Sequence, residues 1–237
     1  MSISKIENIE QAFLLEVEDL KSISNLFNDL PGETIFVLET SDGFSRDFDS
    51  LDEVLNHENS PKNSIQKIEI KKNSHDPYLT LEISFNKNRY RDITCFFSTR
   101  EERFIPAYNR IIECVDGTKP WYSKLSKADF ISYSLITFWI LIITTYALIA
   151  FEVIPTSNEE PSTQDEALAY LLIFVIIAAV FGIGWLMNKL KSKVFPSGAF
   201  AIGQGKKRHK TLENIRWVVI VGGAITLTVS LISLMLA

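Results

Sequence analysis

Apolar and polar positions are distributed unevenly along this chain of 237 residues. Up to about residue 127, apolar positions are interspersed with charged ones, as in an ordinary soluble protein. Three windows of 21 or 22 residues without any charged side chain follow, at 130–151, 167–187 and 217–237. An apolar helix of about 20 residues spans the ~30 Å hydrocarbon core of a bilayer. The pattern therefore predicts three transmembrane helices rather than buried helices of a soluble core.

Before these windows, the periodicity is typical of a mixed α+β domain. Residues 5–29 carry apolar positions at helical spacing, which predicts one or two helices, although 13–17 also suits a short strand. Capping boxes predict a short helix after Ser50 and a longer helix up to about Val115. Strand patterns, the clearest of which alternates strictly, lie at 34–39, 65–70, 78–85 and 90–97.

The predicted fold class is an α+β cytoplasmic domain followed by an all-α bundle of three transmembrane helices. The first domain, residues 1–122, has a four- or five-stranded mixed or antiparallel sheet with helices packed on it. The membrane domain, residues 123–237, contains the three apolar windows and the connection at 188–216.

The distribution of charge predicts the orientation of these helices. Residues 152–166 hold five acidic side chains and no Lys or Arg, whereas residues 188–216, here called the basic loop, hold eight Lys or Arg and one acid. Cytoplasmic loops of membrane proteins carry an excess of Lys and Arg. We therefore expect a multi-pass protein of the plasma (inner) membrane. The N-terminal domain and basic loop are in the cytoplasm, and the C-terminus is outside.

Two interpretations of the basic loop remain open. As a topology determinant, it lies against anionic lipid head groups, with the apolar run 194–202 in the head-group layer and Phe195 and Phe200 pointing inward. Alternatively, it is a site for an anion or a coupling element, because glycines followed by cations offer backbone N–H groups and positive charge together. The spacing is not that of a P-loop. The residues of this candidate site are Gly203, Gly205, Lys206, Lys207, Arg208 and Lys210.

Composition narrows the choice of partners and chemistry. The first 127 residues hold sixteen Lys or Arg against twenty-two Asp or Glu, which argues against nucleic acid as a partner. The opposite charge of the basic loop suggests that it docks on this acidic domain. The sequence has no nucleophile motif, metal-ligand spacing or nucleotide-binding fingerprint. We therefore expect no catalytic residue, metal or cofactor, and we interpret His57, His75 and His209 as solvated.

The predicted transmembrane windows carry no charge, which argues against a pump or an ion-coupled transporter. Glycines in the second and third windows allow close helix packing, so we expect a homo-oligomer. The first hypothesis is a non-enzymatic protein whose cytoplasmic sensor or interaction domain acts on oligomeric membrane helices. Its layout is similar to that of effectors of bacterial anti-phage defence. The second is an anchor or scaffold for a cytoplasmic partner enzyme. The third, an enzyme acting on lipid head groups, lacks a nucleophile.

Overall fold

The structure, a computed structural model of the chain, describes residues 2–87, 92–151 and 163–236. By their internal contacts these residues form two units. One contains the first 127 residues together with the segment from Val194 onward, and the other is Ala128–Lys193. The segment that follows the second apolar helix is therefore grouped with the N-terminal sheet.

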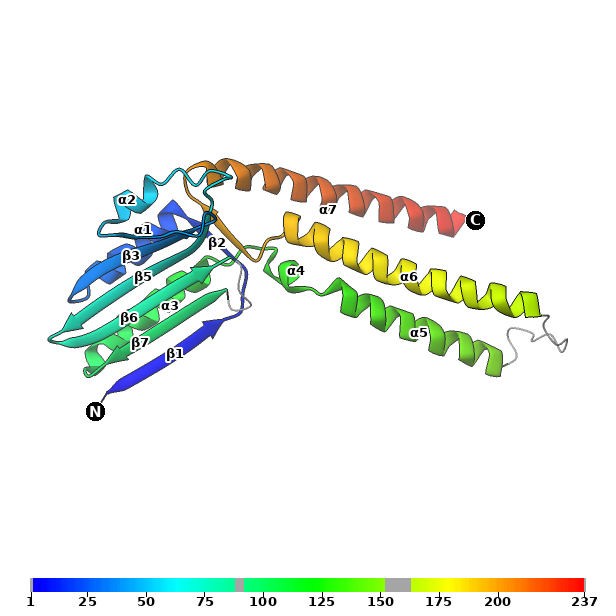
Figure 1. Cartoon of the computed structure of the whole chain (residues 1–237), viewed down its shortest axis with the longest axis horizontal. Coiled ribbons are helices and arrows are strands. Elements are labelled where there is room, and N and C mark those ends of the chain that lie inside the picture. Colours follow the sequence, from blue (N-terminus) through cyan, green and yellow to red (C-terminus); the bar gives the residue numbers. More distant parts are fainter. Residues whose placement is uncertain (1, 88–91, 152–162, 237) are drawn as a thin grey trace. The chain divides into compact units, whose positions relative to one another are not determined.

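The first unit is built on a six-stranded sheet whose order is β1-β7-β6-β5-β3-β4 (Figure 1). All its neighbouring strands are antiparallel. An antiparallel sheet with helices was predicted and is confirmed, but the number of strands, four or five, was wrong. The strands are β1 (Ile3–Ile9), β3 (Glu33–Thr40), β4 (Ser45–Phe48), β5 (Ile65–His75), β6 (Tyr78–Asn86) and β7 (Ile93–Thr99).

The helix predicted from residue 5 begins only at Val17, because residues 3–9 form the edge strand β1. Ile6 and Ile9 are three residues apart, a spacing that suits a helix better than a strand. Pairing with β7 decides in favour of the strand and aligns Ile3 with Thr99. In a strand, Ile6 points to the opposite face from Ile3 and Ile9, and its side chain remains 66% exposed.

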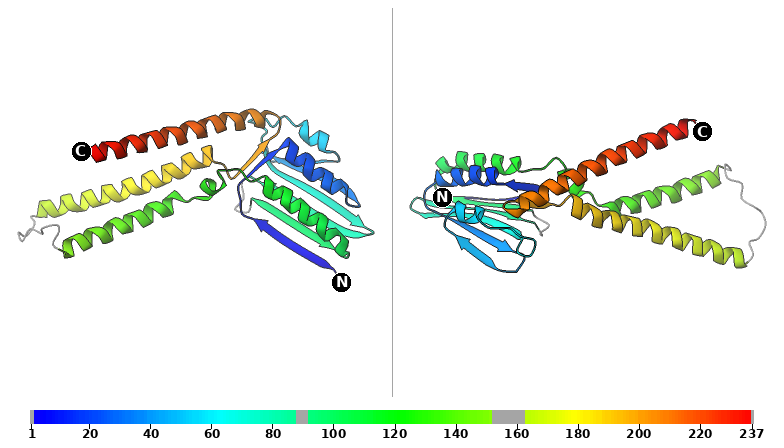
Figure 2. Two further views of the ribbon diagram at one scale, coloured as in Figure 1. Left: turned by 180° about the vertical axis from the view of Figure 1, so that it is seen from behind. Right: turned by 90° about the horizontal axis from the view of Figure 1, so that it is seen from above.

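Helices α1 (Val17–Asn28) and α3 (Ile105–Gly117) cover the same face of the sheet (Figure 2). A short 3₁₀ helix, Glu102–Phe104, precedes α3, so Pro106 stands in the first turn of α3, where its missing N–H costs nothing. Helix α2 (Leu51–Leu55) begins after Ser50, whose Oγ accepts a hydrogen bond from the Glu53 N–H. The core between helices and sheet includes Leu20, Ile23, Phe27, Leu81, Ile83, Cys95, Phe97, Tyr108, Ile111 and Val115.

Most of the basic loop has regular structure. It contains the end of α6 (Thr163–Val194), the strand β8 (Gly198–Ala201) and the beginning of α7 (Gln204–Leu236). Strand β8 pairs in parallel with β2 (Phe13–Glu16) of the N-terminal domain. We call residues 194–216 the docking segment, because they are attached to that domain.

The second unit contains α5 (Phe130–Ala150) and most of α6. The two helices approach closely, since a Cβ atom added at Gly184 would lie 2.5 Å from the Ser134 Oγ. Near their ends, the Asn188 side chain donates to Asp129 (2.8 Å) and accepts from the Phe130 N–H (3.0 Å). These contacts fix α5 and α6 as a helical hairpin.

Helices α5, α6 and α7 each contain a stretch long and apolar enough to cross a membrane, by length and composition. This agrees with the predicted number of transmembrane helices. The acidic connection between the first two apolar windows was predicted to face the side of the membrane opposite the cytoplasm. Most of it, residues 152–162, is not among the described residues.

Candidate functional site

The docking segment is held by the side chain of Asn59, which lies in the loop between α2 and β5. Its Nδ2 donates to the carbonyl oxygens of Phe200 and Ile202, both at 3.1 Å. Its Oδ1 accepts from the Ile65 N–H (3.0 Å) and from Nη2 of Arg208 (2.9 Å). A side-chain amide has two N–H donors and two acceptor positions, so every one of them is used. Asn59 is 1% exposed, and these bonds connect β5, β8 and α7.

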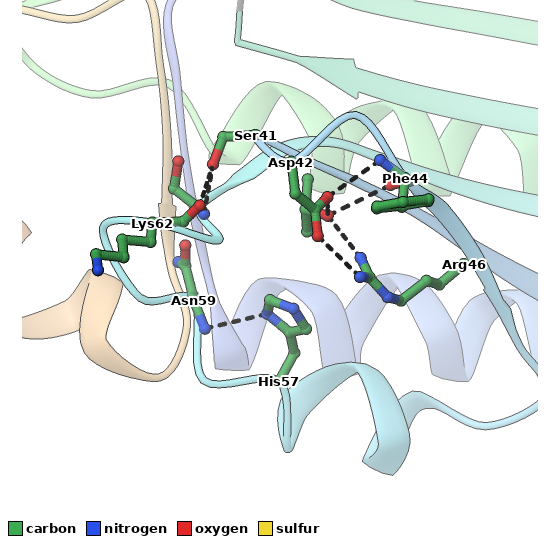
Figure 3. Close-up of polar contacts among 9 residues, drawn as sticks. Ser41, Asp42, Phe44, Arg46, His57, Asn59 and Lys62 are labelled. Carbon is green, nitrogen blue, oxygen red and sulfur yellow. Dashed lines mark hydrogen bonds and ion pairs between the residues drawn. The ribbon is translucent and has the colours of Figure 1, made fainter.

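The backbone of Asn59 has a φ of +49°, in the left-handed region, which Asn tolerates better than most residues. Its N–H donates to Nδ1 of His57 at 3.0 Å (Figure 3). The next contact of this loop also involves the backbone, because the Gln204 N–H donates to the Glu58 carbonyl oxygen (2.9 Å). Loop residues 57–59 therefore form a backbone surface on which α7 begins.

Two predicted site residues, Gly203 and Gly205, are needed for this close approach. Gly203 has a φ of +52°, and an added Cβ would lie 2.7 Å from the His57 carbonyl oxygen and 2.6 Å from that of Glu58. A Cβ at Gly205 would lie 2.4 Å from Nδ2 of Asn59. Real Cβ atoms do not approach this closely, so any other residue would push the segment away from the loop. Both glycines therefore have a packing role here.

Apolar packing fixes the other side of the docking segment. Phe200 is 5% exposed and meets Phe13 edge to face, with 5.3 Å between ring centroids, and Phe13 meets Phe85 in the same way at 5.4 Å. Ile202 is fully buried. The prediction that Phe200 dips into the lipid head groups is therefore wrong. Like the lipid head-group layer, the core of the N-terminal domain shields apolar side chains from water. In addition, pairing with β2 provides hydrogen-bond partners for the backbone of the segment.

A second cluster attaches the last part of the docking segment near Tyr122. Arg216 is fully buried, and its guanidinium carbon lies 4.0 Å from the centroid of the Tyr122 ring. Its Nε donates to the Val194 carbonyl oxygen (2.7 Å), and its Nη1 pairs with Glu213 (2.7 Å). Trp121 donates to the other oxygen of Glu213 (3.1 Å). Desolvation on burial raises the pKa of Tyr122, so its ring remains neutral under this cation.

Two tryptophans from distant parts of the sequence meet at this cluster. The rings of Trp121 and Trp217 are 6.0 Å apart between centroids, and the two side chains are 53% and 55% exposed. Tryptophan is enriched where a membrane protein crosses the membrane–water interface. Their position is therefore suited to the boundary between the polar first part of α7 and its apolar continuation.

The linker to α5 has its own attachment. Helix α4 (Ser123–Lys127) ends at Lys127, which forms an ion pair with Asp92, just before β7. The Asp92 carboxyl is 1% exposed, and desolvation on burial raises its pKa in spite of the lysine. An ion pair with only one partner buried positions the linker more than it stabilises the fold.

The predicted cationic residues separate into two groups. Arg208 binds Asn59, whereas the side chains of Lys206, Lys207 and Lys210 are exposed on α7. Helix dipoles disfavour cations in the first turn, by about 0.3–1 kcal/mol each. The charges of Lys206 and Lys207 therefore destabilise the first turn of α7, and a bound anion would offset this destabilisation. The docking expected from opposite charge is present, but strand pairing, amide hydrogen bonds and apolar burial hold most of it. Two cations of the segment contribute through neutral partners, Arg208 at Asn59 and Arg216 at Tyr122.

The β3–β4 hairpin lies beside the Asn59 loop (Figure 3). Asp42 in its turn pairs with Arg46 at 2.9 Å, and the hydrogen bond from Arg46 holds the pKa of Asp42 well below its usual range. Ser41 connects the hairpin to the loop, since its Oγ donates to the Lys62 carbonyl oxygen and accepts from the Ser64 N–H. The Asp42 carboxylate thus stabilises the turn, since it also accepts from the Phe44 N–H.

Two chemically reactive groups of this unit, His57 and Cys95, are engaged or shielded. Nδ1 of His57 accepts a backbone hydrogen bond, and desolvation raises the pKa of the buried Cys95 thiol to about 12. Among the described residues, no group of three or more His, Cys, Asp or Glu side chains is placed to hold a metal ion. His57 and His209 are half-buried, so the prediction of a solvated side chain holds only for His75.

Comparisons with family models, curated proteins and solved structures found no match.

Sequence reasoning missed Asn59, Tyr122 and Arg216. A polar residue in a loop such as HENSPKNS gives no signal of burial. The glycines gave a partial signal, because an apolar run with Gly198, Gly203 and Gly205 indicates close backbone approach.

Proposed function

We propose that this chain is a non-enzymatic integral membrane protein in which a cytoplasmic sensor or interaction domain is coupled to an oligomeric three-helix membrane domain. The docking segment carries this proposal. Its strand β8 is part of the N-terminal domain, and α7 continues without a break from Gln204 at that domain to Leu236. A continuous helix transmits a displacement of one end to the other, whereas a flexible linker would absorb it.

The membrane orientation in this proposal places the N-terminal domain and the docking segment in the cytoplasm. The excess of Lys and Arg in residues 188–216 and the exposed pair Trp121 and Trp217 support it. At 1.5 Å per residue, Lys210 is about 10 Å and Lys206 about 16 Å from Trp217 along the helix. The head-group layer is only about 5–8 Å thick on each side. Lys210 is therefore better placed than Lys206 to reach anionic lipid head groups.

Within this scheme the membrane helices act together as a homo-oligomer that forms a pore or perturbs the bilayer, as in effectors of bacterial defence. The apolar part of α7 supports self-association, since a Cβ atom added at Gly222 or Gly223 would meet no atom within 4 Å in the described part of the chain outside its own stretch of helix. Small residues of this kind allow close helix contact in lipid.

The second candidate is an anchor that recruits a cytoplasmic partner enzyme. The observation that favours it is the exposure of two large apolar side chains on the N-terminal domain, Ile6 at 66% and Phe44 at 65%. In this case the helices are passive, and the attachment of α7 orients the domain above the membrane.

The deciding experiment compares Asn59→Asp with the wild-type chain in dye-loaded liposomes. Asp cannot donate to the carbonyl oxygens of Phe200 and Ile202, and each buried group left unpaired costs about 1–3 kcal/mol. We expect at least a tenfold weaker attachment of the docking segment and a severalfold change in dye leakage. Asn56→Asp, at an exposed position three residues away, is the matched control and should behave as wild type.

Native mass spectrometry and affinity purification of the same samples separate the candidates. A defined homo-oligomer with leakage that depends on Asn59 supports coupling. Leakage that is identical in both proteins, with the docking segment demonstrably released in the variant, refutes it. A stoichiometric soluble partner without leakage supports the anchor instead.

A further inference from the structure

His57 adjoins the residue that holds the docking segment, and its hydrogen bond defines its protonation state. Its Nδ1 lies 3.0 Å from the backbone nitrogen of Asn59, which carries a hydrogen and can only donate. Nδ1 must therefore present a lone pair. An imidazole accepts at Nδ1 only when it is neutral, with its single proton on Nε2. The geometry requires the neutral form of His57.

Protonation of His57 would turn Nδ1 into a donor that faces another donor. The backbone of Asn59 cannot relax freely, because its φ of +49° already lies in a sparsely populated region. The same short loop supplies the Glu58 carbonyl oxygen that accepts from the Gln204 N–H and packs against Gly203. A shift of residues 57–59 would therefore disturb the contacts that hold the start of α7.

The charges around His57 come from the hairpin and from its own loop. Arg46 of β4 disfavours the imidazolium, whereas Asp42 in the β3–β4 turn and the neighbouring Glu58 favour it. Arg46 and Asp42 are paired with each other, so their effects on His57 largely oppose one another. Burial is the largest influence, and it lowers the pKa of His57.

We propose that His57 is a pH-sensitive positioning residue for the docking segment, which holds Asn59 in place when neutral and releases β8 and the start of α7 when protonated. The biological meaning of this switch rests on the proposed coupling, but its physical operation does not. The sign follows from linkage: a group that is neutral in the docked state takes up a proton on release, so undocking becomes more favourable as pH falls. The effect begins near pH 6.5, the ordinary pKa of histidine, and reaches at most tenfold per pH unit.

The test is hydrogen–deuterium exchange of the full chain in lipid nanodiscs between pH 8 and pH 5. Rates are expressed as protection relative to an unstructured peptide at the same pH, which removes the intrinsic pH dependence of exchange. For wild type we expect protection of residues 198–208 to fall by about tenfold or more across this range. Protection of β6 should stay constant.

His57→Asn keeps an acceptor in place of Nδ1 and cannot titrate, so its protection should not depend on pH. His75→Asn, at the exposed end of β5, should retain the wild-type response. His209→Asn tests the other half-buried histidine, which lies within α7. A response that persists in His57→Asn, or is lost in His209→Asn, overturns the proposal.

A spectroscopic measurement keeps the proposal testable if the His57 variant misfolds. The ¹⁵N chemical shifts of the wild-type imidazole distinguish an unprotonated Nδ1 from a protonated one. We expect the Nε2–H tautomer at pH 8, and a change to imidazolium at the pH where protection falls. A protonated Nδ1 at pH 8 would refute the hydrogen bond itself. Neither outcome depends on leakage, so this inference and the proposed function can fail separately.

Discussion

Replacing Phe200 by alanine tests where the apolar middle of the basic loop lies. The side chain is 5% exposed and packs edge to face on Phe13, which in turn packs on Phe85. Truncation of a buried Phe costs about 3–5 kcal/mol, from lost burial and the cavity left behind. For a unit of this size, 1 kcal/mol corresponds to roughly 2–4 °C in Tm. Phe200→Ala should therefore lower the Tm of the N-terminal domain by roughly 10 °C.

The assay is thermal unfolding of the full chain in mild detergent, followed by near-UV circular dichroism, which reports tertiary packing of the sheet domain. Phe44→Ala is the control, because the Phe44 side chain is 65% exposed and its loss should change Tm by no more than about 1 °C. If Phe200 instead lay among lipid head groups, its truncation would weaken membrane association and leave the Tm of the domain unchanged. A Tm change below about 2 °C would refute the packing described above.

Two further substitutions test the site and the sheet. Gly203→Ala should destabilise the first unit by about 2 kcal/mol or more in denaturant unfolding, because it adds a clash with two carbonyl oxygens to the strain of positive φ. Gly43→Ala, which has positive φ but open space, should cost only about 1 kcal/mol, and equal losses would contradict the clash. Lys72 is 4% exposed and bonded to the Thr34 hydroxyl, and desolvation lowers its pKa. Its charge therefore opposes folding, and the stability of wild type should rise as pH increases from the lowered folded-state pKa towards the ordinary value of about 10.4. Lys72→Met should abolish that rise in unfolding free energy, and an unchanged pH profile would show that Lys72 is not its source.

Several elements follow from sequence alone because local chemistry decides them. Strand β6 was predicted from strict alternation at 78–85, and it forms at Tyr78–Asn86 with Leu79, Leu81, Ile83 and Phe85 buried on one side. The capping box at Ser50 correctly marked the start of α2. The three apolar windows became helices long enough to cross a membrane, since length and absence of charge are properties of the sequence itself.

Other elements were decided by partners far away in the chain. The spacing of Ile6 and Ile9 with the apolar positions that follow fitted a helix, and only pairing with β7 makes residues 3–9 a strand. The apolar run around Phe200 is equally compatible with lipid head groups and with a protein core, because both remove apolar side chains from water. What distinguishes them is the backbone: β2 and Asn59 supply hydrogen-bond partners at fixed positions, which lipid cannot do. The sequence by itself determined that the apolar side chains of residues 194–202 must be shielded from water. Only the tertiary structure decided that the N-terminal domain, rather than the membrane surface, shields them.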